Sequence, residues 1–124
     1  MEIIHSLESL SPLQGSVLTL GSYDGIHRGH REILSSVVNH ARARRLQSVL
    51  ITLDPHPRHV LEKNKMILPM LMSAERKLEI IKEIGLQYIY IIEFTIEFSN
   101  TSAGEFLDNT VVPYFNPKYI IVGY

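Results

Sequence analysis

Two histidines and three glycines stand close together in one segment, which reads G-S-Y-D-G-I-H-R-G-H over residues 21–30. The histidines, His27 and His30, are three residues apart at the predicted start of a helix, so both rings can face the same way. The free backbone N–H groups of a helix N-terminus bind phosphate. Two imidazoles beside such a site can neutralise charge that develops on a polyphosphate leaving group. The segment therefore predicts phosphate chemistry.

The three glycines of this segment leave space for a ligand close to the backbone. Gly21 and Gly25 permit tight turns and a close approach of the backbone to a ligand, and Gly29 leaves room for a base or a sugar. The pattern is not a Walker A loop, because no Gly-Lys-Ser/Thr follows, and it is not G-x-G-x-x-G. Two solvated histidines, or half of a metal site, are the alternatives that the spacing leaves open.

A second segment, Pro55-His56-Pro57, follows a predicted strand. Both prolines fix their own φ and push the preceding residues into extended conformations, so this turn is stiff. Such a turn can hold His56 and an apolar edge against a flat ring. A proline-braced loop without a ligand is the alternative.

Apolar patterns predict the elements that position these segments. Short apolar runs predict buried strands over residues 17–20, 49–53, 88–92 and 119–122. Helical patterns lie between them, over residues 29–45, 73–84 and 102–112, with Ser73 as one N-cap and Ser102-x-x-Glu105 as a capping box. Alternating strands and helices predict an α/β fold, a parallel sheet with helices on both faces. Ligands of such sheets bind beyond the carboxyl ends of the strands.

The composition narrows the functional classes. A chain of 124 residues suits one domain, and 12 basic against 13 acidic residues give no electrostatic case for nucleic acid or a membrane surface. No apolar run approaches the length of a membrane span, and no signal peptide is visible. The absence of cysteine excludes disulfides, cysteine-bound zinc and thiol nucleophiles. These features are compatible with a cytoplasmic protein.

The segment His27-Arg28-Gly29-His30 resembles the H-x-G-H signature of the nucleotidyltransferase superfamily. The longer string is similar to G-x-F-D-G-x-H-x-G-H of the bacterial bifunctional riboflavin kinase/FMN adenylyltransferase (FAD synthetase) family, with Tyr23 in place of Phe. Residues 52–61 resemble that family's T-F-x-P-H-P-x-x-V-L, with Leu53 in place of Phe. The last residues, 120–124, resemble the start of its V-V-G-x-D-F-x-F-G.

This resemblance implies a Rossmann-like nucleotidyltransferase fold and the transfer of AMP from ATP, with Mg²⁺, to FMN, giving FAD and pyrophosphate. It implies that His27 and His30 bind the triphosphate. Substrate-binding roles are implied for Gly21, Ser22, Tyr23, Asp24, Gly25, Gly29, Pro55, His56, Pro57, Val122 and Gly123. The prolines and His56 lie beside the flavin in this interpretation. Phe94, Phe98 and Phe106 are expected in the core rather than in the site.

The chain departs from the family pattern at its end. The given sequence ends at Tyr124, before the position of the family's D-F-x-F-G. It contains neither the family's S-S-T-x-I-R segment nor its riboflavin kinase domain. We therefore expect residues 1–124 to form one incomplete FMN adenylyltransferase domain, from a parent protein that also phosphorylates riboflavin. Another small-molecule cytidylyl- or adenylyltransferase is an alternative. An inactive fragment that binds nucleotide or flavin is the other.

Overall fold

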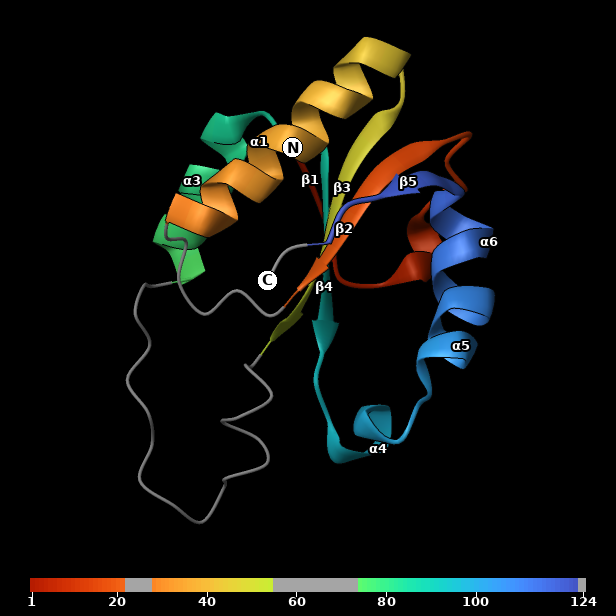
Figure 1. Ribbon diagram of the computed structural model, residues 1–124. Helices are drawn as coiled ribbons and strands as arrows, with labels where there is room; N and C mark the ends of the chain where they lie inside the picture. Colours follow the sequence, from red (N-terminus) through yellow and green to blue (C-terminus); the bar gives the residue numbers. More distant parts are fainter. Residues whose placement is uncertain (22–27, 55–73, 123–124) are drawn as a thin grey trace.

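The computed structural model describes residues 1–21, 28–54 and 74–122 (Figure 1). A five-stranded sheet in the order β1-β4-β3-β2-β5 forms its centre, and every pair of neighbouring strands is parallel. The strands are β1 (Glu2–Ile4), β2 (Ser16–Gly21), β3 (Gln47–Asp54), β4 (Tyr88–Glu93) and β5 (Pro117–Ile120). The predicted parallel sheet is confirmed.

Helices cover both faces of the sheet, as predicted. The long helices α1 (Arg28–Arg44) and α3 (Ala74–Ile84) lie on one face (Figure 1). The other face carries the short helices and turns. These are η1 (Leu7–Ser9), α4 (Ile96–Ser99), α5 (Ala103–Phe106), the π-turn η2 (Leu107–Val111) and α6 (Val112–Phe115).

The order of the strands reverses next to β2. From β2 the chain moves outward through β3 to β4, and it then returns through α4–α6 to β5, which pairs with the free side of β2. In open parallel sheets, ligands bind at such a reversal, in the crevice beyond the carboxyl ends of the strands. A ligand site is therefore expected beyond the carboxyl ends of β2 and its neighbours.

The core has two halves, one on each face of the sheet. Val17 and Leu18 are neighbours in β2 and both are fully buried, but Val17 packs with α1 and α3 whereas Leu18 packs with Val111 and Phe115. Successive side chains of a strand point to opposite faces. Burial on both faces is why the strands are continuous apolar runs rather than alternating patterns.

Three details differ from the predicted elements. Strand β1 has only three residues, two of them exposed, so its sequence carries no apolar pattern. β5 begins at Pro117, two residues earlier than predicted, because this edge strand is largely exposed and its apolar residues do not mark its bounds. The predicted helix over 102–112 continues to Phe115 through a π-turn.

Candidate functional site

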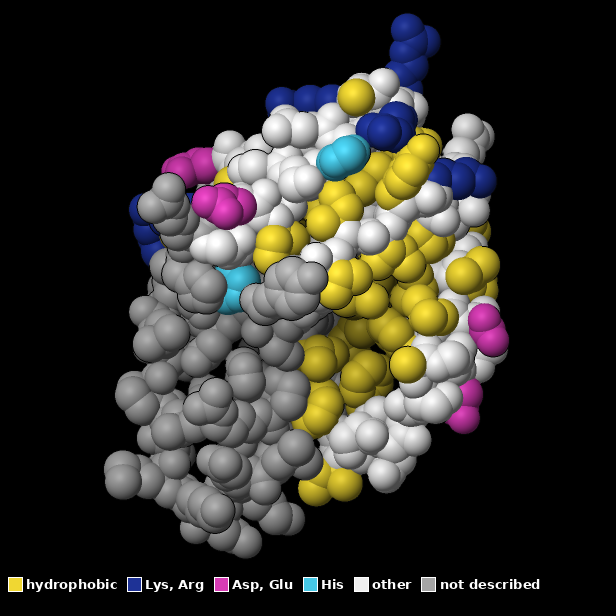
Figure 2. All heavy atoms as spheres, viewed as in Figure 1, with side chains coloured by type: hydrophobic (Ala, Val, Ile, Leu, Met, Phe, Trp, Pro, Cys, Tyr) yellow, Lys and Arg dark blue, Asp and Glu magenta, His cyan; other side chains and the backbone are white. Residues whose placement is uncertain are grey.

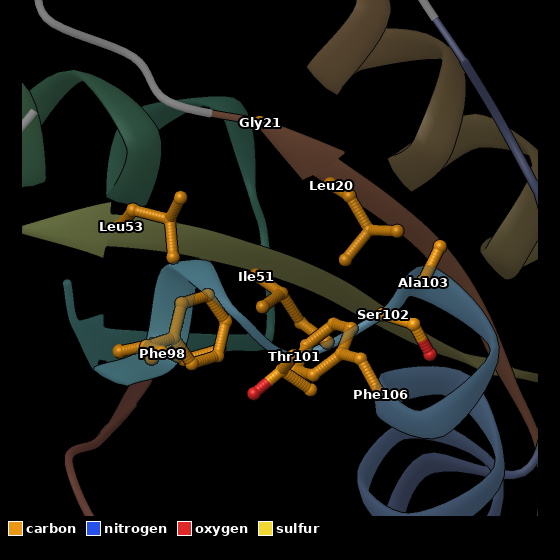
Figure 3. A pocket seen from close by; sticks show the side chains of 10 residues that line it. Leu20, Gly21, Ile51, Leu53, Phe98, Thr101, Ser102, Ala103 and Phe106 are labelled. Carbon is orange, nitrogen blue, oxygen red and sulfur yellow. The ribbon is translucent and has the colours of Figure 1, made fainter. Parts of the chain in front are cut away.

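A pocket of about 410 Å³ opens at the carboxyl edge of the sheet, between the strand ends and helices α4 and α5 (Figure 3). Its lining residues are Leu20, Gly21, Ile51, Leu53, Ile92, Phe98, Thr101, Ser102, Ala103 and Phe106. The volume lies in the range of small-molecule sites, about 300–1,000 Å³. Figure 2 shows hydrophobic side chains gathered around a hollow on this side of the molecule.

The strand wall of the pocket follows from the alternation of side chains along the strands. Leu20 of β2 is paired with Ile51 of β3, and Leu53 lies two residues further along the same face of β3. Figure 3 shows these three side chains pointing toward the aromatic rings opposite. Leu20 keeps 38% of its surface exposed although it lies at the end of a core strand. An exposed leucine that faces a concave apolar wall is available to a ligand.

The helical wall is built from aromatic rings held edge to face. The centroids of Phe98 and Phe106 lie 5.8 Å apart with an interplanar angle of 85°, and those of Phe94 and Phe98 lie 5.9 Å apart at 70°. Phe94 is buried, as expected. The expectation that Phe98 and Phe106 belong to the core is confirmed only in part, because both pack against the buried cluster around Leu18 but are half-buried and also line the pocket.

Side-chain caps fix the two short helices that carry these rings. The Thr95 Oγ1 accepts a hydrogen bond from the Phe98 backbone N–H (3.0 Å), and the Ser102 Oγ accepts one from the Glu105 N–H (3.1 Å). The second bond confirms the predicted N-cap at Ser102. Because each cap orders the first turn of its helix, the rings are held in place before any ligand arrives. The pocket is thus suited to a flat apolar ring, with the Thr101 and Ser102 hydroxyls as its polar groups.

The start of α1 lies at the same edge of the sheet, on the opposite face from α4 and α5 (Figure 1). This helix has 17 residues and no acidic side chain in its first turn, so the positive potential of its N-terminus is not offset there. His30 is half-buried in that turn, and Gly29 beside it is exposed. The edge therefore combines an apolar pocket with the positive end of a long helix.

Some of the residues predicted from the sequence meet at this edge. Gly21 is half-buried at the end of β2 and lines the pocket. Beyond β5 the Ile121 N–H donates to the Leu18 carbonyl (2.9 Å), which brings the next residue, Val122, 80% exposed, to the crevice where the strand order reverses. The other predicted site residues, Ser22, Tyr23, Asp24, Gly25, His27, Pro55, His56, Pro57 and Gly123, lie outside the described residues.

Two buried hydroxyls lie near this edge, on the face of the sheet that α1 covers. Thr19 is fully buried and Thr52, 4% exposed, is paired with Gly21. Neither Oγ1 atom has a hydrogen-bond partner among the residues that the structure describes. A buried hydroxyl without a partner is energetically costly, so these two side chains lower the stability of this part of the sheet. Over the same residues, no group of three His, Cys, Asp or Glu side chains gathers to hold a metal ion.

Comparison with known proteins gives relatives over nearly the whole chain. A bifunctional riboflavin kinase/FMN adenylyltransferase of Escherichia coli K12 is 30% identical over 125 residues, which cover 99% of this chain and 40% of the relative. A protein of the same name from Listeria monocytogenes is 32% identical over 108 residues, covering 87% and 34%. The chain thus spans about two-fifths of the length of the curated relatives it matches.

A crystal structure described as a macrolide-efflux protein from Streptococcus pneumoniae superposes with a TM-score of 0.80 at 26% identity, covering 98% of this chain and 40% of that one. The likeness supports the Rossmann-like fold. Within its described residues, this chain has no helix long and apolar enough to cross a membrane. A model of the FAD synthetase family matches residues 10–124, and the chain therefore belongs to that family.

Proposed function

We propose that this chain takes part in the transfer of AMP from ATP to FMN, giving FAD and pyrophosphate. The observation that carries the proposal is the apolar, aromatic pocket at the same sheet edge as the start of α1. FMN has two parts that match these two features, a flat apolar ring system and a phosphate. Membership of the FAD synthetase family and the names of the relatives support the same assignment.

In this proposal the flavin ring enters the pocket and contacts Phe98 and Phe106, while the FMN phosphate extends toward the edge of the sheet. An oxygen of that phosphate attacks the α-phosphorus of ATP in line. The bond between the α-phosphorus and the bridging oxygen to the β-phosphate breaks, and the electron pair leaves with pyrophosphate. No covalent intermediate with the protein is needed, so catalysis rests on positioning and on stabilisation of charge.

His30 and the N-terminus of α1 bind the α- and β-phosphates in this proposal, and His27 of the sequence motif assists them. A protonated or N–H-donating imidazole stabilises the negative charge that grows on the leaving pyrophosphate. Mg²⁺ arrives with ATP as part of the substrate. Magnesium is usually held by phosphates and one or two carboxylates. Glu93, exposed at the end of β4, is a described carboxylate on this edge.

The other candidate functions are a different small-molecule nucleotidyltransferase and a flavin- or nucleotide-binding fragment without turnover. A pocket walled by two edge-to-face phenylalanines favours a flat ring over a short polar acceptor such as glycerol phosphate. We propose only the adenylyl transfer for these residues. We assign no part of the riboflavin kinase activity, which the relatives' names include, to these residues.

The test is to incubate the protein with FMN and Mg-ATP and to separate the products by chromatography. We expect FAD and pyrophosphate in equal amounts. Parallel reactions replace FMN by glycerol phosphate or phosphopantetheine, and ATP by CTP. A product from one of these replacements, with none from FMN and ATP, would overturn the proposal in favour of another nucleotidyltransferase. Saturable FMN binding without any FAD would instead identify a binding fragment.

A further inference from the structure

A second pocket, of about 360 Å³, lies at the opposite, amino edge of the sheet. It forms where α1 ends before β3 and where α3 ends before β4. Its polar lining consists of Arg42, Arg45, Gln47, Ser48 and Gln87, with Gly85 at the end of α3. Nothing in the proposed adenylyl transfer uses these residues.

The charged side chains that line this pocket are all positive. Arg42 and Arg45 line it, and no carboxylate is among its described lining residues. Neither guanidinium forms a hydrogen bond or an ion pair with any residue that the structure describes. Figure 2 shows Lys and Arg side chains gathered at the top of the view, over the end of α1. Two guanidiniums without a counter-charge beside a pocket favour an anionic ligand.

The amide of Gln87 adds a hydrogen-bond donor. The Ser48 N–H donates to the Gln87 Oε1 (3.0 Å), and the Gln87 N–H donates to the Ser48 Oγ (2.9 Å). Ser48 is buried, so this reciprocal pair anchors the glutamine to the start of β3. With its oxygen engaged in this way, the Gln87 side chain presents its Nε2 group as a donor.

Arg45, which follows the end of α1, has a strained backbone conformation. The Leu46 N–H donates to the Ala41 carbonyl (2.9 Å) and the Arg45 N–H to the Arg42 carbonyl (3.4 Å), the two bonds of a Schellman helix end. That motif puts Arg45 at φ 56°, in the left-handed region that favours glycine. At the end of α3, Gly85 takes the equivalent position with φ 104°. An arginine held where glycine fits better suggests a use for its side chain.

The positive charge of Arg45 is not needed to stabilise the C-terminal ends of α1 and α3. The carbonyls at the ends of α1 and α3 create a negative potential, which attracts cations. A Cβ atom built on Gly85 would lie 2.8 Å from the Arg42 Nη2, so that guanidinium already lies against the end of α3. Arg42 and Arg44 both stand in the last turn of α1. Arg45 therefore adds a charge beyond what the helix ends require.

We propose that Arg42, Arg45 and the Gln87 amide form a binding site for a phosphate group at the amino edge of the sheet, separate from the proposed FMN site. Arginine guanidinium groups bind phosphate through paired N–H donors, and the pocket has room for more than a bare ion. The ligand is inorganic phosphate or a small phosphate monoester.

The test is a titration of the ¹⁵N-labelled protein with inorganic phosphate, and separately with glycerol phosphate, at constant ionic strength set with chloride. We expect saturable shifts of the Arg42 and Arg45 Nε–Hε and Gln87 Nε2 signals. Tighter binding of the monoester would assign the site to phosphorylated small molecules, and equal binding would assign it to free phosphate. Linear shifts without saturation, or shifts only at the start of α1, would overturn the proposal.

Arg45→Gly separates a binding role from a structural one. Glycine relieves the left-handed strain, so the variant should melt at a higher temperature than the wild type without phosphate. Its phosphate affinity should nevertheless fall at least about tenfold, on the scale of a charged hydrogen bond. Arg76→Gln removes one positive charge from α3 outside the pocket and should leave the affinity unchanged. Equal phosphate binding by wild type and Arg45→Gly would contradict the proposal.

Discussion

The two edges of the sheet carry pockets of similar size and opposite character. The carboxyl-edge pocket, about 410 Å³, is walled by apolar side chains such as Leu20, Phe98 and Phe106. The amino-edge pocket, about 360 Å³, is lined by Arg42 and Arg45 together with amide and hydroxyl groups. The helix α1 joins the two edges, since it begins at the first and ends at the second.

The direction of the helices accounts for this difference. At the carboxyl edge, a helix N-terminus supplies positive potential from its backbone, so the side chains there can be apolar and can contact a ring. At the amino edge, the helix C-termini supply negative potential. Any anion site at that edge must therefore be built from charged side chains that outweigh the helix ends.

The largest effect is expected for His30→Ala, which removes the described imidazole from the start of α1. In a chain that forms FAD, the rate should fall about 100-fold or more, the scale for loss of one transition-state donor. His40→Ala is the matched control, because His40 is an exposed histidine of the same helix that bonds only toward its C-terminal end, at Arg44. The rate of FAD formation is measured by chromatography. Equal rates for the two variants would show that His30 has no part in the reaction.

The next effect concerns the apolar pocket. Phe98→Ala should weaken FMN binding by about 10- to 100-fold, because contact with a phenyl ring contributes about 1.5–3 kcal/mol when it is fully buried. Ile96→Ala serves as the control, since Ile96 belongs to the same helix α4 but is 51% exposed and does not line the pocket. Quenching of FMN fluorescence gives both affinities. If Phe98→Ala binds FMN as tightly as Ile96→Ala does, the flavin does not occupy this pocket.

A smaller effect is expected at the buried hydroxyls on the α1 face of the sheet. Thr19→Val should raise the free energy of unfolding by roughly 1 kcal/mol, because it removes a buried polar atom that has no partner among the described residues. Thr95→Val is the contrasting variant. Its hydroxyl caps α4, so its loss should lower the same quantity by about 1 kcal/mol. Urea unfolding measures both, and destabilisation by Thr19→Val would mean that its hydroxyl is hydrogen-bonded after all.

The smallest effect concerns Tyr90, which lies between the two edges and contacts the ring of Phe115 (5.8 Å between centroids). Burial, and then the neighbouring Tyr114, raise the pKa of the Tyr90 phenol above its ordinary value of 10.0. The folded state therefore holds this proton more tightly than the unfolded state does. Its contribution to stability is complete below pH 10 and is lost as the pH rises through the folded-state pKa.

Tyr90→Phe should accordingly reduce the fall in the free energy of unfolding at alkaline pH. Denaturant unfolding between pH 8 and 11 is the measurement. Tyr119→Phe, which removes an exposed hydroxyl from the edge strand β5, is the control. The same alkaline decline in Tyr90→Phe and in the wild type would show that burial of Tyr90 has no part in it.

Much of the fold could be predicted because its central strands are buried on both faces. Val17 and Leu18 are adjacent and both inaccessible, and short apolar runs of this kind, ended by glycine or proline, favour strands buried on both faces. The Ser102 cap was predictable for a local reason, since its hydrogen bond spans only three residues. β1 was not predictable, because it has only three residues and two of them are exposed, so no apolar run marks it.

The site was predictable only in part. The sequence motifs indicated the carboxyl edge, and Gly21 and the start of α1 lie there. The roles predicted for His27 and for Pro55, His56 and Pro57 stay predictions, since these residues lie outside the described structure. Phe98 and Phe106 were assigned to the core, because a half-buried aromatic ring in a pocket and a fully buried one have the same local pattern.

The most direct test of the account is to locate the flavin ring on the protein. In a complex of isotope-labelled protein with unlabelled FMN, we predict nuclear Overhauser effects from the ring methyl protons of the flavin to Phe98, Phe106 and Leu20. This result would place the ring in the carboxyl-edge pocket. Contacts from the ring methyl protons to Val38 and Leu46, the apolar side chains that line the amino-edge pocket, with none to the phenylalanines, would contradict the division of roles between the two edges.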